Sequence, residues 1–374
     1  DHAVGLRRIS DVPVGVLLSG GLDSSSVATS LALQASSQVS SFTVRFSEPG
    51  YDEGPLARKV ADRWKLDYHE LILSPDEVLS RLHKASRLND EPLVHGNDLH
   101  IWAISQYAKP HVTVLLSGEG GDETLGGYVR YQPLRYPAML RAARPFLPRA
   151  ISILGINGRW RKLGRFLSMG PMDRFVMFNS CDVLPSDLEY LGMNPSRRMP
   201  FREKVLEEAR SLYPGEPFRQ AMYSDLHTFL CSILDRNDRM TMGASIECRV
   251  PFLDYRLVEG LAALPSSALL AGKGQETKYV LRRALGDRLP VEVLKHRKWG
   301  FAVPWSQYLR KTPALRRLVS ELPDLDPVRE GPFNRARVRA AVTSFLNGEP
   351  QHEALVRQLV MVAAWYQACI ETRP

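Results

Sequence analysis

Cysteine is scarce in this chain, and the sequence also lacks a membrane-spanning run and the two most familiar phosphate-binding motifs. Its four cysteines, Cys181, Cys231, Cys248 and Cys369, lie far apart, with no C-x-x-C pair and no Cys/His cluster at zinc spacing. We therefore expect reduced core thiols rather than a disulfide scaffold or a zinc site. No apolar run approaches the roughly 18 to 20 residues that a membrane-spanning helix needs, which excludes such a helix.

The first residues, DHAVGLRRIS, also lack a secretion signal, because they contain neither an apolar core nor a small-residue cleavage site. We therefore expect a cytoplasmic protein. The chain begins at Asp1 rather than at Met, which indicates that a segment upstream is missing.

Two familiar phosphate-binding loops are absent as well. The sequence contains no G-x-x-x-x-G-K-[ST], and no G-x-G-x-x-G follows its first apolar strand. What is present is positive charge: the net charge of +8 suits an anionic ligand, and many basic residues lie between Arg130 and Arg202. We interpret that stretch as a solvated basic helical surface, with an RNA-binding surface as the alternative.

At 374 residues, with 44% apolar and 24% charged residues, the chain has the composition of an ordinary globular protein with a sizeable core. Its first third alternates short apolar stretches with helical patterns, which predicts an α/β fold with a doubly wound parallel sheet. The predicted strands are Val14–Leu18, Val39–Phe46, Tyr68–Leu73 and Val112–Leu116, and the predicted helices are Ser24–Gln34, Pro55–Leu66, Pro75–Asn89 and Asn97–Ala108.

Beyond about Tyr131 the strand pattern fades. We expect a single unit over residues 1–374, with an α/β core in residues 10–135 and a large, mostly helical C-terminal portion in residues 136–374. A closing helix with one apolar face is expected to pack against the rest. The predicted helices of this portion are Met172–Asn179, Phe201–Leu212, Gln220–Met242, Arg256–Ala263, Thr277–Leu285 and Glu353–Thr372.

The stretch VLLSG occurs twice, first at Val16–Gly20, where GLDSS follows. An apolar strand that ends in a Ser-Gly-Gly turn and continues as a helix presents backbone N–H groups that attract phosphate. The alternative is an ordinary strand-to-helix turn capped by a serine. The glycines permit close backbone approach, the serines offer hydroxyls and the aspartate can hold a divalent metal ion: these are Gly20, Gly21, Ser19, Ser24 and Asp23.

VLLSG recurs at Val114–Gly118, where EGGDE follows. This copy brings the carboxylates of Glu119, Asp122 and Glu123 to the end of a predicted strand. Carboxylates beside a phosphate site can act as metal ligands and as a general base, although an acidic surface turn is the alternative. Because the carboxyl ends of parallel strands meet at one edge of a sheet, we interpret the two copies as two walls of one site rather than as a repeat.

These motifs carry a family resemblance. Ser-Gly-Gly-Leu-Asp-Ser after a strand resembles the pyrophosphate loop of the ATP pyrophosphatases, and SGEGGDETLGGYVRY resembles a signature of the synthetase domain of the asparagine synthetases. Two further segments, DRNDRMTMGASIECRVPFLDYRLVE and GQETKYVLRRALGDRLPVEVLKHRKWGFAVPW, resemble that family's next signatures, in the same order. The resemblance covers most of the chain from Ser10 to Trp305 and implies an adenine nucleotide alpha hydrolase-like fold.

In that family, ATP activates the side-chain carboxylate of aspartate as an adenylate, and ammonia then displaces AMP to form the amide. The resemblance therefore implies ATP and Mg²⁺ as cofactors and aspartate or another carboxylate as substrate. It implies that two strand ends contact the adenosine portion and that two loops bind the phosphates. The residues so assigned are Leu18 and Val44 for the adenosine portion, and Ser19, Gly20, Gly21, Asp23, Ser24, Ser117 and Gly118 for the phosphates.

Roles in chemistry follow from the same resemblance. Glu119 matches the family's catalytic glutamate, and Asp23 and Asp122 would share Mg²⁺. Lys278 would place a positive charge on the departing pyrophosphate, with a solvated lysine on a helix face as the alternative. Two further candidates for the acceptor pocket are Arg249 and Asp254, with a structural Arg–Asp pair as the alternative.

The nitrogen source lies outside this sequence. Family members usually carry an upstream glutaminase domain whose N-terminal cysteine releases ammonia from glutamine, and these residues contain none. We therefore expect the chain to use free ammonia or to receive it from the missing domain. The sequence leaves the oligomeric state open, with a homodimer as one arrangement, and we expect no membrane partner.

Other functions use the same scaffold. Relatives close β-lactam rings or cyclise peptides; the β-lactam branch has tyrosine where this chain has Glu119, so Glu119 favours the asparagine branch over that one. A tRNA-modifying ATP pyrophosphatase would share the SGG-x-DS loop, but its cysteines are not suitably placed here, so we do not expect nucleic acid as a partner. A scaffold without activity would not need both metal carboxylates and a base.

Overall fold

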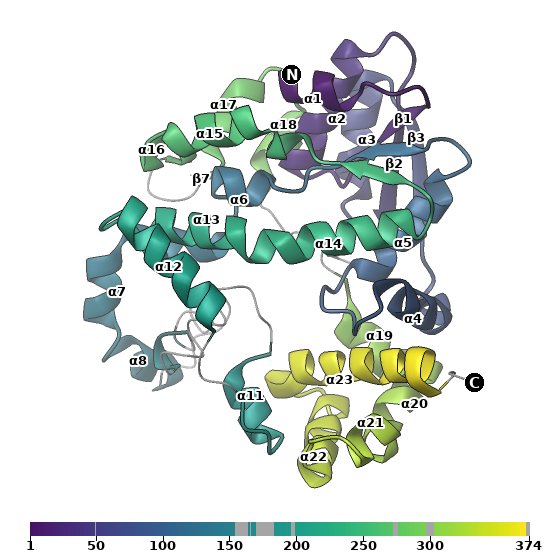
Figure 1. Ribbon diagram of the computed structural model, residues 1–374, viewed down its shortest axis with the longest axis vertical. Coiled ribbons are helices and arrows are strands. Elements are labelled where there is room, and N and C mark those ends of the chain that lie inside the picture. The colour runs from purple at the N-terminus through teal and green to yellow at the C-terminus, as the bar shows by residue number, and fades with distance from the viewer. Residues whose placement is uncertain are drawn as a thin grey trace.

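A five-stranded parallel sheet forms the centre of the N-terminal part (Figure 1). The computed structural model describes residues 1–48, 50–153, 164, 166–169, 183–195, 199–271, 276–296 and 303–371. The strand order is β3-β2-β1-β4-β5, and every pairing is parallel, so the predicted α/β fold is confirmed. The strands are β1 (Val14–Leu17), β2 (Ser40–Arg45), β3 (Asp67–Ile72), β4 (Val114–Leu116) and β5 (Glu247–Arg249).

The fifth strand was not predicted from the sequence. It has only three residues, Glu-Cys-Arg, and shows no apolar run or alternation. It forms because it pairs in parallel with β4, with Glu247 opposite Val114. The sheet thus contains strands from both sides of the expected boundary near residue 135. The division into two portions stays a prediction.

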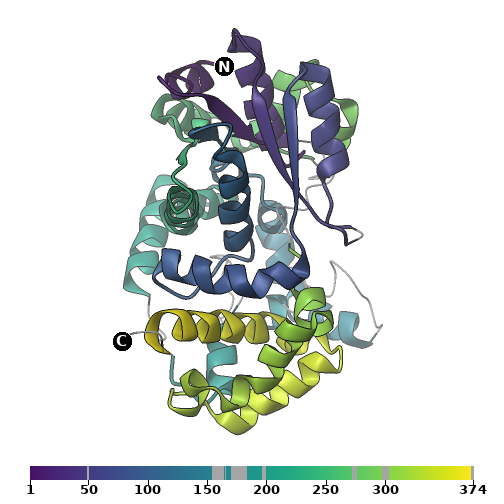
Figure 2. The same ribbon diagram turned by 90° about the vertical axis from the view of Figure 1, so that its right-hand side faces the viewer.

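Helices cover both faces of the sheet, which gives the molecule two apolar cores. Side chains alternate between the faces of a strand, so Leu115 belongs to one core with α4 and α5, and Leu116 belongs to the other with α2 and α3. Figure 2 shows helices on either side of the strands. The bounds of these helices are α1 (His2–Arg7), α2 (Leu22–Gln34), α3 (Gly54–Trp64), α4 (Pro75–Asn89), α5 (Asp98–Ala108) and α6 (Gly121–Leu125).

The C-terminal portion is mostly helical, as predicted. Its last helix packs against α4 and has its apolar side chains in the core. Met172–Asn179 lies outside the described residues, as does Thr372. The bounds are α7 (Pro137–Ala143), α8 (Leu147–Ile153), α11 (Pro185–Tyr190), α12 (Pro200–Leu212), α13 (Pro217–His227), α14 (Phe229–Met242), α15 (Tyr255–Ala263), α16 (Ser266–Leu269), α17 (Tyr279–Leu285), α18 (Val291–Lys295), α19 (Trp305–Lys311), α20 (Pro313–Glu321), α21 (Asp326–Arg329), α22 (Arg335–Leu346) and α23 (Glu353–Tyr366), with a short hairpin of β6 (Leu270–Ala271) and β7 (Glu276–Thr277).

One predicted helix is broken. The sequence predicts a single helix over Gln220–Met242, but the structure has α13 and α14 with a break at Thr228, where φ is −127° and ψ is −68°. The Thr228 hydroxyl donates to the Ser224 carbonyl at 2.7 Å, a local bond that competes with the helical ladder. The break allows α14 to begin at Phe229, whose side chain lines the cavity described below.

Cysteine placement was predicted less well, and Cys181 lies outside the described residues. Of the described cysteines, Cys248 and Cys369 are partly exposed and Cys231 is exposed, so the expected core position is wrong for Cys231; all three are free thiols.

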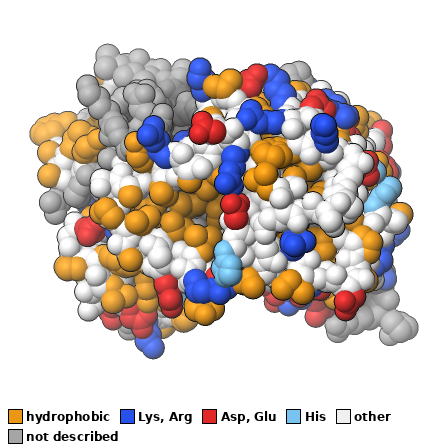
Figure 3. Space-filling view, turned by 90° about the horizontal axis from the view of Figure 1, so that it is seen from above, with side chains coloured by type: hydrophobic (Ala, Val, Ile, Leu, Met, Phe, Trp, Pro, Cys, Tyr) orange, Lys and Arg blue, Asp and Glu red, His pale blue; other side chains and the backbone are white. Residues whose placement is uncertain are grey.

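Seen from above (Figure 3), basic side chains are interspersed with acidic and apolar ones. Within the described part of the chain, no helix has the length and apolar character needed to cross a membrane.

Candidate active site

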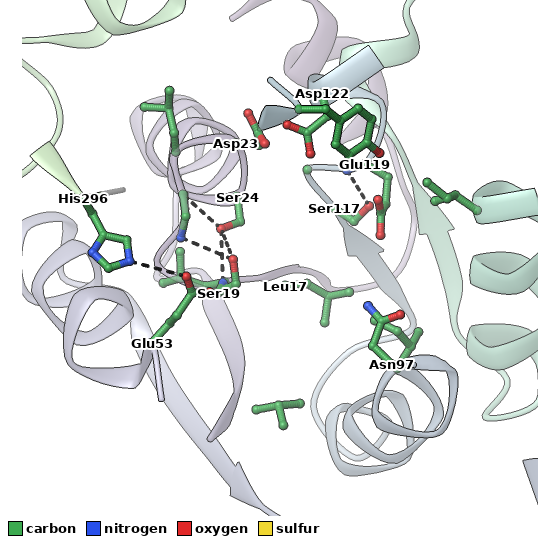
Figure 4. Close-up of a pocket in the computed structure, with 18 of the residues that line it drawn as sticks. Leu17, Ser19, Asp23, Ser24, Glu53, Asn97, Ser117, Glu119, Asp122 and His296 are labelled. Carbon is green, nitrogen blue, oxygen red and sulfur yellow. Dashed lines mark hydrogen bonds and ion pairs between the residues drawn. The ribbon is translucent and has the colours of Figure 1, made fainter. Parts of the chain in front are cut away.

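A cavity of about 610 Å³ lies at the carboxyl ends of β1, β2 and β4. This is the edge where open parallel sheets bind ligands. Figure 4 shows side chains from both VLLSG loops pointing into it, with Asn97 on the side of Ser117 and Glu119. The structure brings together in this one cavity the predicted site residues Leu18, Ser19, Gly21, Asp23, Ser24, Val44, Ser117, Gly118, Glu119, Asp122 and Lys278.

The first loop is held by hydrogen bonds between its two serines. The Ser19 backbone N–H donates to Ser24 Oγ at 3.1 Å, and the two hydroxyl oxygens lie 3.0 Å apart. The loop ends at Gly21, the N-cap of α2, so the helix N-terminus faces the cavity. Gly20 does not line the cavity. Its φ is +80°, and a Cβ there would lie 2.7 Å from the Ala57 backbone N, so this glycine permits the close approach of α3.

The two VLLSG copies lie on adjacent strands but are staggered. Val16 pairs with Leu116 rather than with Val114, which shifts the copies by two residues. This stagger brings the second loop against the start of α2: a Cβ on Gly118 would lie 2.8 Å from the Ser24 backbone N. The two copies therefore end adjacent strands of one sheet and form two walls of one cavity, and the loops are packed directly against each other.

We expect Gly118→Ala to force these two loops apart. The added Cβ would approach the Asp23 backbone carbon to 3.0 Å, and overpacking of this kind costs about 1 to 3 kcal/mol. Chemical denaturation measures the loss in unfolding free energy, and nucleotide titration measures the loss in affinity. Gly260→Ala is the matched control, because a Cβ at Gly260 in α15 meets no atom within 4 Å. Equal stability of the two variants would contradict this account.

Lys278 lies between the two carboxylates predicted to hold a metal ion. Its ammonium contacts Asp23 Oδ2 and lies 2.6 Å from Asp122 Oδ1. The side chain is buried, so the alternative of a solvated lysine is wrong. Burial lowers the pKa of Lys278, while the Asp23 carboxylate opposes that shift. The residue has φ of +56°, a left-handed conformation that costs a non-glycine residue about 1 to 2 kcal/mol and that tends to occur at functional sites.

The same carboxylates fit a divalent cation that arrives with a nucleotide. Asp23 Oδ1 is buried and has no hydrogen-bond partner among the described residues, so it retains an acceptor for a metal ion. Asp23 and Asp122 face each other in Figure 4. Among the described residues, no group of three or more His, Cys, Asp or Glu side chains could hold a metal by itself. This fits Mg²⁺, which is usually held by one or two carboxylates together with phosphate oxygens and water.

Glu119 is held by an arginine that the sequence reasoning missed. Arg236, near the middle of α14, donates from Nη2 to Glu119 Oε1 at 2.6 Å and from Nη1 to Asn97 Oδ1 at 2.7 Å. Arg236 is only 5% exposed, whereas the Glu119 side chain is 28% exposed, so the arginine holds the carboxylate from the buried side. The available signal was DRNDRMTM, a segment recognised as part of a family signature but given no role. A second missed pair, His296 and Glu53, lies 3.7 Å apart at the pyrophosphate-loop end (Figure 4).

Asp98, at the start of α5, is expected to make stability depend on pH. Burial raises the pKa of this carboxyl to about 7, although Arg236 opposes the shift. Because the folded-state pKa lies above the unfolded value of 3.8, the stabilisation is complete below that value and is lost as pH rises through about 7. At about 1.4 kcal/mol per pKa unit, the loss can reach about 4 kcal/mol.

Asp98→Asn should remove most of this dependence, which urea unfolding at pH 5 and pH 8 would measure. The amide keeps the size of the side chain and cannot ionise. Asp76→Asn is the matched control, since Asp76 also lies in the first turn of its helix but is exposed. An unchanged pH profile in Asp98→Asn would show that Asp98 is ionised in the folded protein.

Aromatic rings and a second arginine form the far wall. Tyr128, Arg130, Phe229 and His95 line the cavity. The Arg130 guanidinium carbon lies 3.8 Å from the Tyr128 ring centroid and 5.3 Å from that of Phe229. Arg130 was predicted to belong to a solvated basic surface, and for this residue the prediction is wrong, because its side chain is held against these rings.

The predicted acceptor residues Arg249 and Asp254 do not line the cavity. Arg249 donates to the Arg7 and Ile9 carbonyls and pairs with Glu247 at 2.6 Å. Asp254 caps α15 and pairs with Arg256 at 3.0 Å, and the Arg256 guanidinium lowers its pKa to about 2. Both residues therefore fix the edge of the sheet and a helix start. They do not pair with each other, so the alternative of one structural Arg–Asp pair is also wrong.

Comparison with known proteins agrees with this geometry. The asparagine synthase family matches residues 1–367. Glutamine-hydrolysing asparagine synthetase 1 of Bacillus subtilis is 30% identical over 312 residues, covering 82% of this chain and 49% of that protein. A putative glutamine-hydrolysing asparagine synthetase of Mycobacterium bovis is 31% identical over 325 residues, covering 83% and 48%. Amidase chry2 of Gibberella zeae is 27% identical over 346 residues, covering 81% and 51%.

The fold and the family match define an α/β synthetase domain of the PP-loop type. The chain belongs to the asparagine synthase family. It spans about half the length of the curated relatives that it matches.

Proposed function

We propose that this chain forms an amide at the expense of ATP, with aspartate as the carboxylate and ammonia as the nucleophile. The observation that carries the proposal is the convergence of the Ser19 loop, the Glu119 loop and Lys278 in one cavity. Carboxylate activation requires a turn that binds phosphate, a buried cation and a carboxylate that can accept a proton. Membership in the asparagine synthase family supports ATP-dependent amide ligation.

The proposed reaction has two steps. A side-chain carboxylate oxygen of aspartate attacks the α-phosphorus of ATP, and the bond to the β-phosphate oxygen breaks to release pyrophosphate. Ammonia then attacks the activated carbonyl carbon, loses a proton, and AMP departs. Activation is needed because a carboxylate resists nucleophilic attack, whereas AMP is a good leaving group.

The residues of the chain have distinct tasks in this scheme. The backbone N–H groups after Ser19 bind the pyrophosphate portion, and Lys278 offsets the charge that develops on it. Glu119 accepts a proton from the attacking ammonia, and Arg236 holds that carboxylate in place. Mg²⁺, held by Asp23 and Asp122, would neutralise phosphate charge.

The nitrogen source is part of the proposal. The curated relatives named as glutamine-hydrolysing are about twice as long as the matched region. We propose that a glutaminase domain of the full protein supplies ammonia to the cavity and that this chain accepts free ammonium in its absence. The proposed setting is the cytoplasm, where ATP and aspartate are available.

The test is the release of AMP and pyrophosphate by the purified chain with ATP, Mg²⁺ and ammonium, with and without aspartate. Aspartate-dependent release of both products, with asparagine formed in equal amount, is the expected result. No aspartate-dependent AMP would contradict the proposal. Stimulation by tRNA in place of aspartate would favour a tRNA-modifying pyrophosphatase.

A second candidate is amide formation on a larger biosynthetic acceptor. The specific observation in its favour is the match to amidase chry2, which covers 81% of this chain. The same assay with peptides or other natural-product carboxylic acids separates the two functions, because only the second predicts AMP release with acceptors larger than aspartate.

A further inference from the structure

We propose that Arg130 binds a second anionic group on the acceptor, the one that is not activated, and thereby selects dicarboxylic substrates. This inference rests on the proposed function and concerns a residue to which the family resemblance assigned no role. Three observations support it: the position of Arg130 in the cavity, its remaining hydrogen-bond donors, and the Asp225 carboxylate that fixes its position.

Arg130 lies in the aromatic wall of the cavity, against Tyr128 and Phe229. Its guanidinium stacks on Tyr128, and the Tyr128 hydroxyl donates to Glu123 Oε1 at 2.6 Å. Glu123 lies on α6, directly after the loop that carries Glu119. Both Arg130 and Glu119 line the cavity, so both face a molecule bound in it.

Two other cations that line the cavity, Lys278 and Arg236, are held by side chains of the protein. Lys278 contacts two carboxylates, and Arg236 uses both terminal nitrogens, for Glu119 and Asn97. Arg130 also pairs with a carboxylate, but through one terminal nitrogen: within the described part of the chain its one hydrogen bond joins Nη2 to Asp225 Oδ2 at 2.6 Å. Its Nη1 donates no hydrogen bond among those residues. A guanidinium has five N–H donors, so Arg130 retains donors for a ligand.

The position of Arg130 is fixed in advance. Asp225 is buried and also accepts a hydrogen bond from the Tyr131 hydroxyl, so its carboxylate is anchored behind the guanidinium. Phe229 closes the other side, with its ring 5.9 Å from that of Tyr128. A cation held in this way loses little side-chain entropy when a ligand binds. The planar fork and remaining donors of arginine match the two oxygens of a carboxylate.

The competing explanation is that Arg130 only neutralises Asp225 and packs on aromatic rings. The two explanations differ in one respect: a ligand contact depends on the charge of the acceptor, whereas a packing role does not. Aspartate and its α-amide form the required pair, because they differ only in the charge of the group that Arg130 would bind.

The experiment measures AMP formation with aspartate and with aspartate α-amide for wild type, Arg130→Gln and Arg130→Lys. We expect wild type to prefer aspartate by roughly 10- to 100-fold in kcat/KM, the range of a charged hydrogen bond. Arg130→Gln should remove that preference by raising KM for aspartate while KM for ATP stays unchanged. Arg130→Lys should retain part of the preference. Equal loss of activity with both acceptors in Arg130→Gln would overturn the inference.

Two controls keep the result interpretable. Arg310→Gln removes an arginine with a similar setting outside the cavity, 4.2 Å over Phe345 and paired with Glu353 at 2.9 Å, and it should keep the preference for aspartate. If Arg130→Gln does not fold, the Arg130→Gln/Asp225→Asn double variant removes both charges of the buried pair and should show the same loss of preference.

Failure of the proposed function gives a different result. If wild type forms no AMP with aspartate, that function is wrong, and calorimetry with a non-hydrolysable ATP analogue and Mg²⁺ tests the inference separately. Wild type should then bind aspartate or glutamate more tightly than the corresponding α-amides, and Arg130→Gln should lose the difference. Absence of such a preference in wild type would overturn the inference.

Discussion

Replacement of Glu119 by glutamine is expected to lower the rate of amide formation by roughly 10²- to 10⁴-fold, the range of general acid–base catalysis. The amide has the size of the carboxylate and can still accept the hydrogen bond from Arg236 Nη2, but it cannot take a proton from ammonia. Nucleotide binding should change little, because Glu119 makes no hydrogen bond to the Ser19 loop among the described residues. Steady-state assays of AMP and asparagine, together with nucleotide titration, measure the two effects.

Glu247→Gln is the matched control for this prediction. Glu247 also pairs with an arginine at 2.6 Å, on β5, but it does not line the cavity. Its replacement should leave the rate unchanged. A fully active Glu119→Gln would remove Glu119 from the mechanism and leave Arg236 as an anchor without a catalytic partner.

Replacement of Lys278 by methionine is expected to lower the rate of pyrophosphate release by roughly 10²- to 10³-fold, the effect of losing one preorganised group that stabilises developing charge. The variant keeps the length of the side chain and removes its charge. It also leaves Asp23 and Asp122 facing each other without the ammonium that now lies between them. Breaking a buried ion pair from one side can cost about 3 to 5 kcal/mol, so the protein should also become less stable.

Mg²⁺ provides a readout of this second effect that does not depend on turnover. In Lys278→Met a divalent cation can offset the repulsion between the two carboxylates, so the rise in melting temperature on adding Mg²⁺ should exceed that of wild type. Lys59→Met is the control, because Lys59 pairs with Glu292 at 2.5 Å on the surface. Equal Mg²⁺ responses in all three proteins would contradict the assignment of Asp23 and Asp122 as metal ligands.

Strands β1 and β4 were predictable because they are short apolar runs with clear boundaries, and β2 has buried residues at its centre. Strand β3 is a mixed stretch with no buried residue, and only its tyrosine, leucine and isoleucine indicated a strand. The local sequence pattern is sufficient to predict a strand where its side chains are buried, whichever elements pack on it. The strand at Glu247–Arg249 could not be found in this way, since it exists only through its pairing with β4. The helix break at Thr228 was missed for a related reason: the apolar pattern continues through it, and only the local hydroxyl bond and tertiary packing interrupt the helix.

The meeting of the candidate residues in one cavity could be predicted where they lie directly at strand ends, and their roles stay predictions. Of the loop residues named from motifs, together with Lys278, all but Gly20 and Glu123 line the cavity. Arg236 was missed because its position in the middle of α14 carries no local signal for a contact with Glu119. Arg249 and Asp254 were misplaced because nearness in sequence to a signature does not determine the direction of a side chain.

The sequence by itself determined the kinds of chemistry available: a Ser-Gly-Gly turn for phosphate, a carboxylate-rich turn for metal and proton, and a buried-strand pattern that brings both to one edge. Only the tertiary structure decided which charges meet. Lys278 reaches Asp23 from more than 250 positions away along the chain, and Arg130 turns inward because Asp225 and two aromatic rings hold it there. The strand and turn patterns follow from local backbone and burial preferences, whereas charge pairing depends on distances that only the packed chain sets.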